Sequence, residues 1–97
     1  MMRIAVATLD KKENSEISEV VGRAPFFLIF EGKKIVETVN NPFRFGSGGA
    51  GPSVAKMLAD KEVNLVIAGK FGGNMISALK ERKVDYKEAT GKAIDAL

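Results

Sequence analysis

The sequence of 97 residues contains no cysteine and no histidine. The absence of cysteine excludes disulfide bonds, a thiolate nucleophile and a thiolate metal site. Without histidine, the chain also lacks the commonest metal ligand and the commonest general base of enzymes. These two absences restrict the function more than any residue that is present.

Tryptophan is absent as well, tyrosine occurs once, and no apolar run approaches the length of a membrane span. The formal net charge is +3, but the lysines are scattered among glutamates. This pattern is typical of a solvated surface with a mild preference for anions, not of a nucleic-acid interface. No basic leader or apolar segment precedes the first predicted strand. We therefore expect a soluble, cytoplasmic protein without a nucleic-acid or membrane partner.

Hydrophobic periodicity predicts a single α/β domain over residues 1–97. Strands are predicted at 3–8, 26–31, 35–40, 64–68 and 84–88, and helices at 53–61, 75–83 and 92–97. A further helical turn is predicted near 15–20, within a polar surface loop. The first half contains a hairpin, whereas strands alternate with helices in the second half, which favours right-handed parallel crossovers. The simplest arrangement is a five-stranded mixed sheet in the order 3-2-1-4-5, with strand 2 antiparallel and helices on its faces.

Two glycine-rich loops each lead into a predicted helix. The first spans residues 45–52, with its helix beginning near Pro52 or Ser53, and the second spans 69–74. Free N–H groups before a helix N-terminus form a natural anion site, although a flexible connection explains the first loop equally well. The predicted topology brings both loops to the carboxyl edge of the sheet, where ligands of open α/β sheets bind. The predicted binding residues are Arg23, Gly46, Ser47, Gly48, Gly49, Gly51, Gly69, Lys70, Gly72 and Asn74.

Several of these residues have a purely structural interpretation as well. Arg23 fits an anion clamp or an exposed position at a strand start, and Lys70 is also explained as a solvated lysine. For Asn74 we favour a role as the cap of the second helix. Asp10 ends the first strand, where a two-metal nuclease would need converging carboxylates, but Glu88 is the nearest other acid.

Short motifs in a fixed order cover nearly the whole chain. They are Met2-Arg3-Ile4-Ala5-Val6-Ala7, Gly22-Arg23-Ala24-Pro25-Phe26-Phe27, Asn41-Pro42, Gly49-Ala50-Gly51-Pro52, Val66-Ile67-Ala68-Gly69-Lys70-Phe71-Gly72 with Asn74, and Tyr86-Lys87-Glu88-Ala89-Thr90-Gly91. With these motifs the chain resembles the dinitrogenase iron–molybdenum cofactor biosynthesis family, the NifX-type domain that also ends NifB-type proteins.

The resemblance implies a ribonuclease-H-like three-layer fold. It also implies an iron–sulfur or iron–molybdenum cofactor precursor as ligand, and cofactor-assembly proteins as partners. Similar sequences often carry histidine just before the Gly-Arg-Ala motif and in the first glycine loop, where this chain has Val20-Val21 and Gly46-Ser47-Gly48. We therefore expect backbone N–H groups, together with Arg23 or Lys70, to bind a ligand here.

Three functions are compatible with the sequence. The first is a non-enzymatic binding or carrier domain for an anionic metallocofactor or another small anion. The second is a protein-interaction or regulatory domain that keeps the fold without binding a cofactor. The third, a hydrolase or nuclease, is disfavoured by the missing histidine and the sparse carboxylates. The sequence leaves the identity of the ligand and the oligomeric state open.

Overall fold

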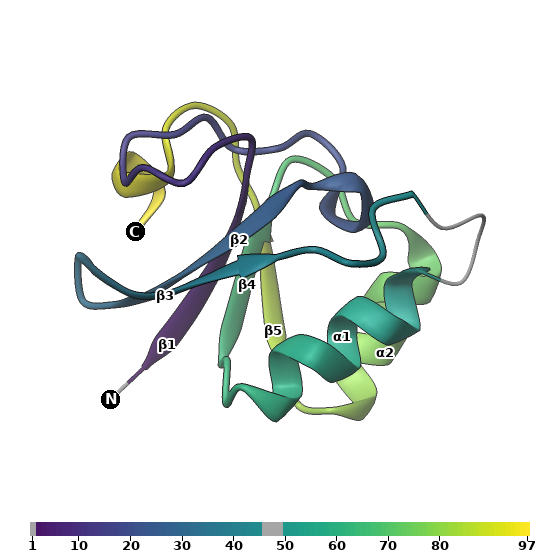
Figure 1. Cartoon of the computed structure of the whole chain (residues 1–97). Coiled ribbons are helices and arrows are strands. Elements are labelled where there is room, and N and C mark those ends of the chain that lie inside the picture. The colour runs from purple at the N-terminus through teal and green to yellow at the C-terminus, as the bar shows by residue number, and fades with distance from the viewer. Residues whose placement is uncertain (1, 46–49) are drawn as a thin grey trace.

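Five strands form one mixed sheet in the order β3-β2-β1-β4-β5 (Figure 1). The computed structural model describes residues 2–45 and 50–97. The strands are β1 Arg3–Thr8, β2 Phe26–Glu31, β3 Lys34–Asn40, β4 Leu65–Ala68 and β5 Asp85–Glu88. β2 is antiparallel to both of its neighbours, whereas β1, β4 and β5 are parallel to one another. The predicted strand order and the antiparallel orientation of strand 2 are confirmed.

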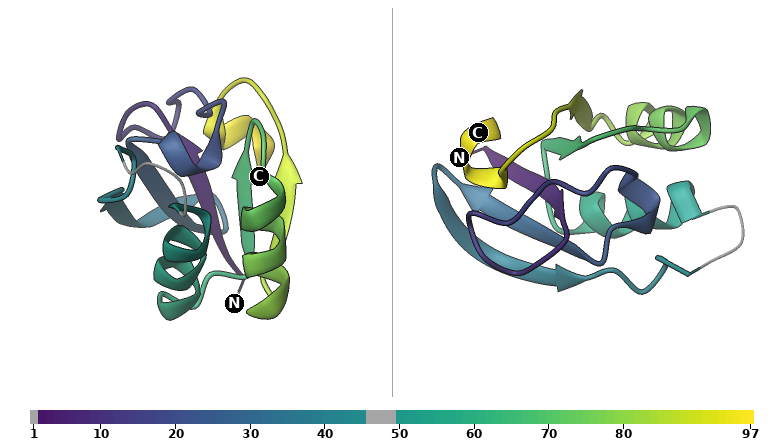
Figure 2. Two further views of the ribbon diagram at one scale, coloured as in Figure 1. Left: turned by 90° about the vertical axis from the view of Figure 1, so that its right-hand side faces the viewer. Right: turned by 90° about the horizontal axis from the view of Figure 1, so that it is seen from above.

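Both α-helices cover the same face of the sheet, side by side (Figure 2). They are α1 Ala50–Asp60 and α2 Gly73–Glu81. Leu58 of α1 and Leu79 of α2 are fully buried in the same cluster as Phe27 of the sheet. α1 begins before the predicted start at Ser53, because a proline such as Pro52 is tolerated in the first helical turn, where N–H groups have no intrahelical partner.

The segment 9–20 and a short C-terminal 3₁₀ helix, η2 Ala93–Ala96, cover the opposite face (Figure 2). Ile17 and Ala93 pack there against buried sheet residues such as Leu28. Layers on both sides of the sheet confirm the predicted fold class. The predicted C-terminal helix is therefore present as a 3₁₀ helix, which places apolar side chains over the sheet.

The helical turn predicted near 15–20 is wrong. Ile17 is bridged to Thr8 in an extended conformation, its N–H donates to the Gly91 carbonyl at 2.8 Å, and the Ser18 N–H donates to the Ala7 carbonyl at 2.8 Å. Among the described residues, the nearest helical turn is η1, a 3₁₀ turn at Val21–Arg23. Long-range backbone pairing has therefore overridden the local preference of this segment. In residues 2–45 and 50–97, no helix is long and apolar enough to cross a lipid bilayer.

Candidate functional site

A shallow pocket of about 160 Å³ lies where η1 meets the first turns of α1 and α2. This is the carboxyl edge of the parallel strands, as predicted from the topology. The pocket is lined by Val20, Val21, Gly22, Gly51, Gly72, Asn74 and Met75. The structure thus brings three of the predicted binding residues together, Gly51 from the first turn of α1 and Gly72 and Asn74 from the start of α2.

The N-terminus of α2 lies at this pocket, and no side chain caps its N–H groups. Gly72 is the N-cap residue, with φ −73° and ψ 161°, and it has no side chain that could cap the helix. The prediction that Asn74 caps α2 is wrong, because the helix begins at Gly73 and Asn74 lies inside it. No acidic side chain is present in the first turn of either helix. The free N–H groups at this end form the positive end of the helix dipole, and no acidic side chain in the first turn offsets it.

Neither packing nor backbone conformation requires glycine at positions 72 and 73. A Cβ atom at either position would have no heavy atom within 4 Å, and neither residue has a positive φ. An alanine would therefore fit the folded chain at both positions. The absence of side chains leaves the backbone of this turn open to close approach by a ligand.

Gly51 has a different role, since it brings the two helices together. A Cβ atom on Gly51 would lie 3.1 Å from the Met75 nitrogen and 3.2 Å from its Cα. The contact places the first turn of α1 directly against the first turn of α2. Two helix N-termini therefore meet at one wall of the pocket, which adds their local positive potentials.

Gly69 is explained by packing against the segment before η1. A Cβ atom on Gly69 would lie 2.5 Å from the Glu19 carbonyl oxygen, and the Gly69 N–H donates to the Ser18 carbonyl at 2.9 Å. In the same loop the Phe71 N–H donates to Glu88 Oε2 at 3.3 Å. These two N–H groups already have partners within the chain. The loop therefore offers its helix-proximal part, from Gly72 onward, to a ligand.

Arg23 and Lys70 flank the pocket but do not line it. Both are exposed, and the Arg23 guanidinium donates to the Arg44 carbonyl at 3.2 Å. The Lys70 carbonyl accepts the N–H of Val21, a pocket residue, at 3.2 Å. Both cations therefore lie next to residues that line the pocket, Arg23 beside Gly22 in sequence and Lys70 through its backbone contact with Val21. Gly46, Ser47, Gly48 and Gly49, the remaining predicted binding residues, lie outside the described residues.

Asn41 is a site-supporting residue that the sequence did not single out. Its side chain is buried, and Nδ2 donates to the Gly22 carbonyl at 3.2 Å and to the Ala24 carbonyl at 2.9 Å. Oδ1 accepts the Phe43 N–H at 2.9 Å. Asn41 therefore ties the turn that forms one pocket wall to the end of β3. The sequence contains one indication of this role. An asparagine followed by proline at a strand end commonly hydrogen-bonds through its side chain to nearby backbone groups.

The described residues contain no group of three or more His, Cys, Asp or Glu side chains that could hold a metal ion. The Asp10 carboxylate is exposed and accepts the N–H of Lys11 at 2.8 Å, and Glu88 accepts that of Phe71. Converging carboxylates for two-metal chemistry are therefore not seen in the described part of the chain. Nor does it offer the soft ligands that bind iron–sulfur clusters, since the chain has no cysteine or histidine. The described residues therefore do not provide side chains that could coordinate a metal ion at the pocket.

Two other hollows are less suited to an anion. One, of about 330 Å³ beside α1, is lined by Lys56 and Asp60, whose side chains hydrogen-bond at 2.8 Å. That hydrogen bond holds the pKa of Asp60 below its ordinary value, so the lysine charge is neutralised within the chain. The other, of about 410 Å³, lies at Met2, Ile4, Gly32, Lys33 and Leu97 and is mostly apolar. The edge pocket is the hollow in which helix N-termini converge.

The strand order and the two helices define a small α/β domain with one five-stranded mixed sheet. The chain belongs to the dinitrogenase iron-molybdenum cofactor family, whose model matches residues 2–97. An uncharacterized protein of Methanocaldococcus jannaschii is 29% identical over 99 residues, which cover 98% of this chain and 80% of that protein. The resemblance stated from the sequence motifs is thereby confirmed.

Solved structures show the same architecture. The apo orange protein from Desulfovibrio gigas matches with a TM-score of 0.90 and 24% identity, over 99% of this chain and 83% of its own. A Thermotoga protein described as a candidate NifB protein matches with a TM-score of 0.81 and 30% identity, over 99% of this chain and 84% of its own. At 24% identity the likeness to the orange protein shows the fold alone.

Proposed function

We propose that this chain is a non-enzymatic binding or carrier domain for an anionic metallocofactor or another small anion. The observation that carries the proposal is the edge pocket, in which the N-terminus of α2, which has no side-chain cap, meets the first turn of α1. Helix N-termini bind anions through free N–H groups and the positive end of the dipole.

The pocket walls strengthen this electrostatic attraction. Val20, Val21 and Met75 provide apolar walls, and Gly72 and Gly73 leave the N–H groups unshielded by side chains. A hydrogen bond from an N–H group to an anion is stronger where water is partly excluded. Arg23 and Lys70 at the rim add positive charge without closing the entrance.

The ligand chemistry follows from the donors that the chain has. No cysteine or histidine is available to replace a ligand on a metal, so an iron–sulfur or iron–molybdenum precursor would have to arrive with its coordination complete. The domain would then recognise its negative charge and outer atoms, and release would need no metal–protein bond to break. Such reversible binding suits a carrier that passes its ligand to a cofactor-assembly protein.

Membership of the dinitrogenase iron-molybdenum cofactor family supports this class of ligand. The likeness to a Thermotoga protein described as a candidate NifB protein supports a partner in cofactor assembly.

Anaerobic reconstitution tests the proposal. Ferrous iron, sulfide and molybdate are added to the protein, which is then separated by gel filtration and examined for co-eluting metal and visible absorbance. We expect a coloured complex that is weakened by Arg23→Ala and Lys70→Ala and unchanged by Lys80→Ala, which removes one charge from the far end of α2. Co-elution that is equally strong in the Arg23→Ala/Lys70→Ala double variant and in a heat-unfolded sample would contradict a built site.

The alternative is a protein-interaction domain that keeps the fold without a cofactor. It is favoured by Phe45, which is 83% exposed and has the Arg44 guanidinium 4.6 Å from its ring centroid. Exposed aromatic and arginine side chains are enriched where proteins bind one another. Partner capture that is lost in Phe45→Ala, together with no co-eluting metal in the reconstitution, would favour this alternative.

A further inference from the structure

β5 forms one border of the sheet and leaves its outer side open. It pairs with β4, and in the left view of Figure 2 no other part of the described chain runs along its far side. In the same view α2 lies over the sheet and does not project beyond β5. All four residues of the strand are exposed. An edge of this kind can accept another strand.

The backbone direction of β5 determines which residues could pair with such a strand. The Asp85 N–H donates to the Asn64 carbonyl at 2.9 Å, and the Ala89 N–H donates to the Ala68 carbonyl at 3.0 Å. Backbone groups alternate in direction along a strand, so the N–H and C=O groups of Tyr86 and Glu88 are directed away from β4. A second strand would have to match its own outward residues to these two.

We propose that the β5 strands of two copies of this chain pair in antiparallel fashion about a two-fold axis at Tyr86. Only registers that place outward residues opposite outward residues make a ladder. With the axis at Tyr86, Asp85 faces the partner subunit's Lys87 and Lys87 faces the partner subunit's Asp85. With the axis at Lys87, two lysines face each other, which is unfavourable for directly opposed residues. Charge therefore selects the first register.

The side chains are positioned for this pairing. Asp85 and Lys87 lie opposite Leu65 and Ile67 in the register with β4, so both are on the sheet face away from the α-helices. Lys87 Nζ is held on that face by donating to the Ala96 carbonyl at 3.0 Å. In the proposed register Asp85 and the partner subunit's Lys87 form a non-hydrogen-bonded pair, in which opposed Cα atoms are about 4.5 Å apart and side chains are close.

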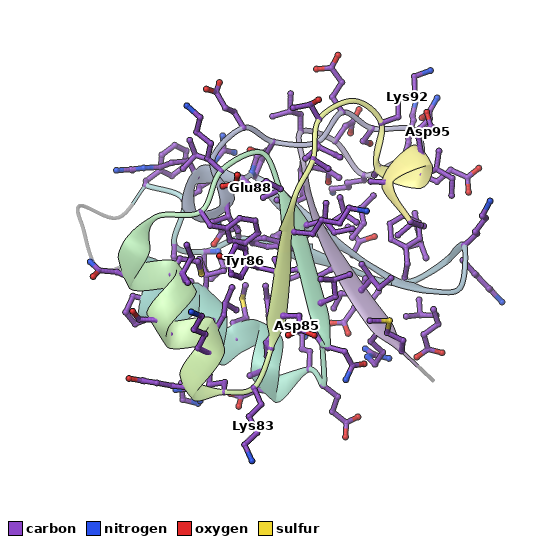
Figure 3. All side chains as sticks on the ribbon, turned by 180° about the vertical axis from the view of Figure 1, so that it is seen from behind. Lys83, Asp85, Tyr86, Glu88, Lys92 and Asp95 are labelled. Carbon is purple, nitrogen blue, oxygen red and sulfur yellow. The ribbon has the colours of Figure 1, made fainter. Side chains whose placement is uncertain are left out.

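Tyr86 points to the helix-covered face (Figure 3). Its ring centroid lies 5.0 Å from that of Phe71, and the residue is 38% exposed. Pairing would place the two Tyr86 side chains next to each other across the axis and cover their exposed edges. Aromatic cross-strand pairs of this kind stabilise a sheet.

The strand contains four residues, so the interface is small and the dimer should be weak. Interfaces below about 1,000 Å² are typical of transient association. We expect a dissociation constant between about 10 μM and 1 mM, so that the average mass rises with protein concentration. This self-association does not depend on the proposed anion site.

Charge reversal tests the register. Sedimentation equilibrium up to about 1 mM protein should show the dimer, and Asp85→Lys or Lys87→Asp alone should weaken it by about tenfold, because each variant opposes like charges twice. The double variant Asp85→Lys/Lys87→Asp should restore dimerisation, as should mixing the two single variants. Lys33→Asp, a charge reversal in the exposed β2–β3 turn, is the matched control and should have no effect.

Circular dichroism should be used to establish that each variant is folded. The single tyrosine gives an independent signal, because Tyr86 fluorescence and its NMR resonances should change with concentration in the wild type. A wild-type protein that stays monomeric up to about 1 mM, or a dimer that both single variants leave intact, would overturn the proposal. In the first case the charges of β5 protect a solvent-exposed edge against pairing.

Discussion

The backbone of Glu19 lies directly against Gly69. A Cβ atom on Gly69 would be 2.5 Å from the Glu19 carbonyl oxygen and 2.8 Å from its Cα, and the Gly69 N–H donates to the adjacent Ser18 carbonyl at 2.9 Å. This contact joins the end of β4 to the segment that continues into the pocket wall at Val20 and Val21. The shape of the edge pocket therefore depends on the absence of a side chain at Gly69.

We expect Gly69→Ala to lower the free energy of unfolding by about 1–3 kcal/mol, because the methyl group can be accommodated only by moving backbone. Urea denaturation monitored by circular dichroism measures the change. Gly73→Ala is the matched control, since a Cβ atom there meets nothing within 4 Å. It should leave stability unchanged or raise it by a few tenths to about 1 kcal/mol, because alanine has the higher helix propensity. Equal stability of the two variants would contradict the packing role of Gly69.

Asn41→Ala should destabilise the protein by about 1–3 kcal/mol, because the Gly22 and Ala24 carbonyls and the Phe43 N–H lose their buried partner. Asn41→Asp should be at least as damaging, since it replaces a donor by a negative charge facing two carbonyl oxygens. Chemical denaturation tests both. The neighbouring Asn40 is exposed, and Asn40→Ala should change stability by less than about 0.5 kcal/mol.

Glu62 and Lys83 lie just after the C-terminal ends of α1 and α2 and adopt the left-handed conformation, with φ 62° and 59°. The Val63 N–H reaches back to the Leu58 carbonyl at 3.2 Å, and the Val84 N–H reaches the Leu79 carbonyl at 2.9 Å, which is the Schellman pattern. Because a side chain is disfavoured in this conformation, Glu62→Gly and Lys83→Gly should each raise the free energy of unfolding by about 1 kcal/mol.

The melting temperature provides a convenient measure of these two substitutions. Lys80→Gly, inside the last turn of α2, is the control and should lower stability by about 1 kcal/mol. Destabilisation by all three glycines would show that left-handed strain at the helix ends is not relieved by glycine.

Gly72→Asp should affect stability and anion binding in opposite directions. An aspartate at the N-cap position satisfies first-turn N–H groups and should raise stability by a few tenths of a kcal/mol. The same carboxylate competes with an added anion and should weaken its binding by about tenfold. Gly72→Asn provides a similar cap without the charge and should weaken binding less. Isothermal titration with sulfate compares the three proteins, and identical affinities would argue against binding at α2.

Strong local patterns made most of the fold predictable. The hairpin of residues 26–31 and 35–40 has dense β-branched and aromatic strands around a tight polar turn, and its observed strands agree with the prediction within one residue. The segment 15–20 was mispredicted because its conformation depends on pairing with the distant residues Ala7 and Gly91. No local window of sequence contains that information.

Only some of the predicted binding residues meet in one pocket. The glycine and helix patterns indicated the carboxyl edge of the sheet, where the structure places Gly51, Gly72 and Asn74 around the edge pocket. The sequence did not distinguish the packing glycine Gly69 from the open glycine Gly72, because the neighbour that decides it, Glu19, lies far away in the chain. For the same reason it did not reveal that Asn41 supports the pocket wall.

An NMR titration tests whether an anion binds where the N-termini of α1 and α2 meet. Amide resonances of the ¹⁵N-labelled protein are followed as sulfate or molybdate is added at constant ionic strength maintained with chloride. We expect saturable shifts for Gly51, Gly72, Gly73 and Asn74, while Gly32 in the β2–β3 turn and Gly91 remain unchanged. Shifts that never saturate, or that spread over the exposed lysines without affecting the first turn of α2, would contradict an anion site at the meeting point of the two helices.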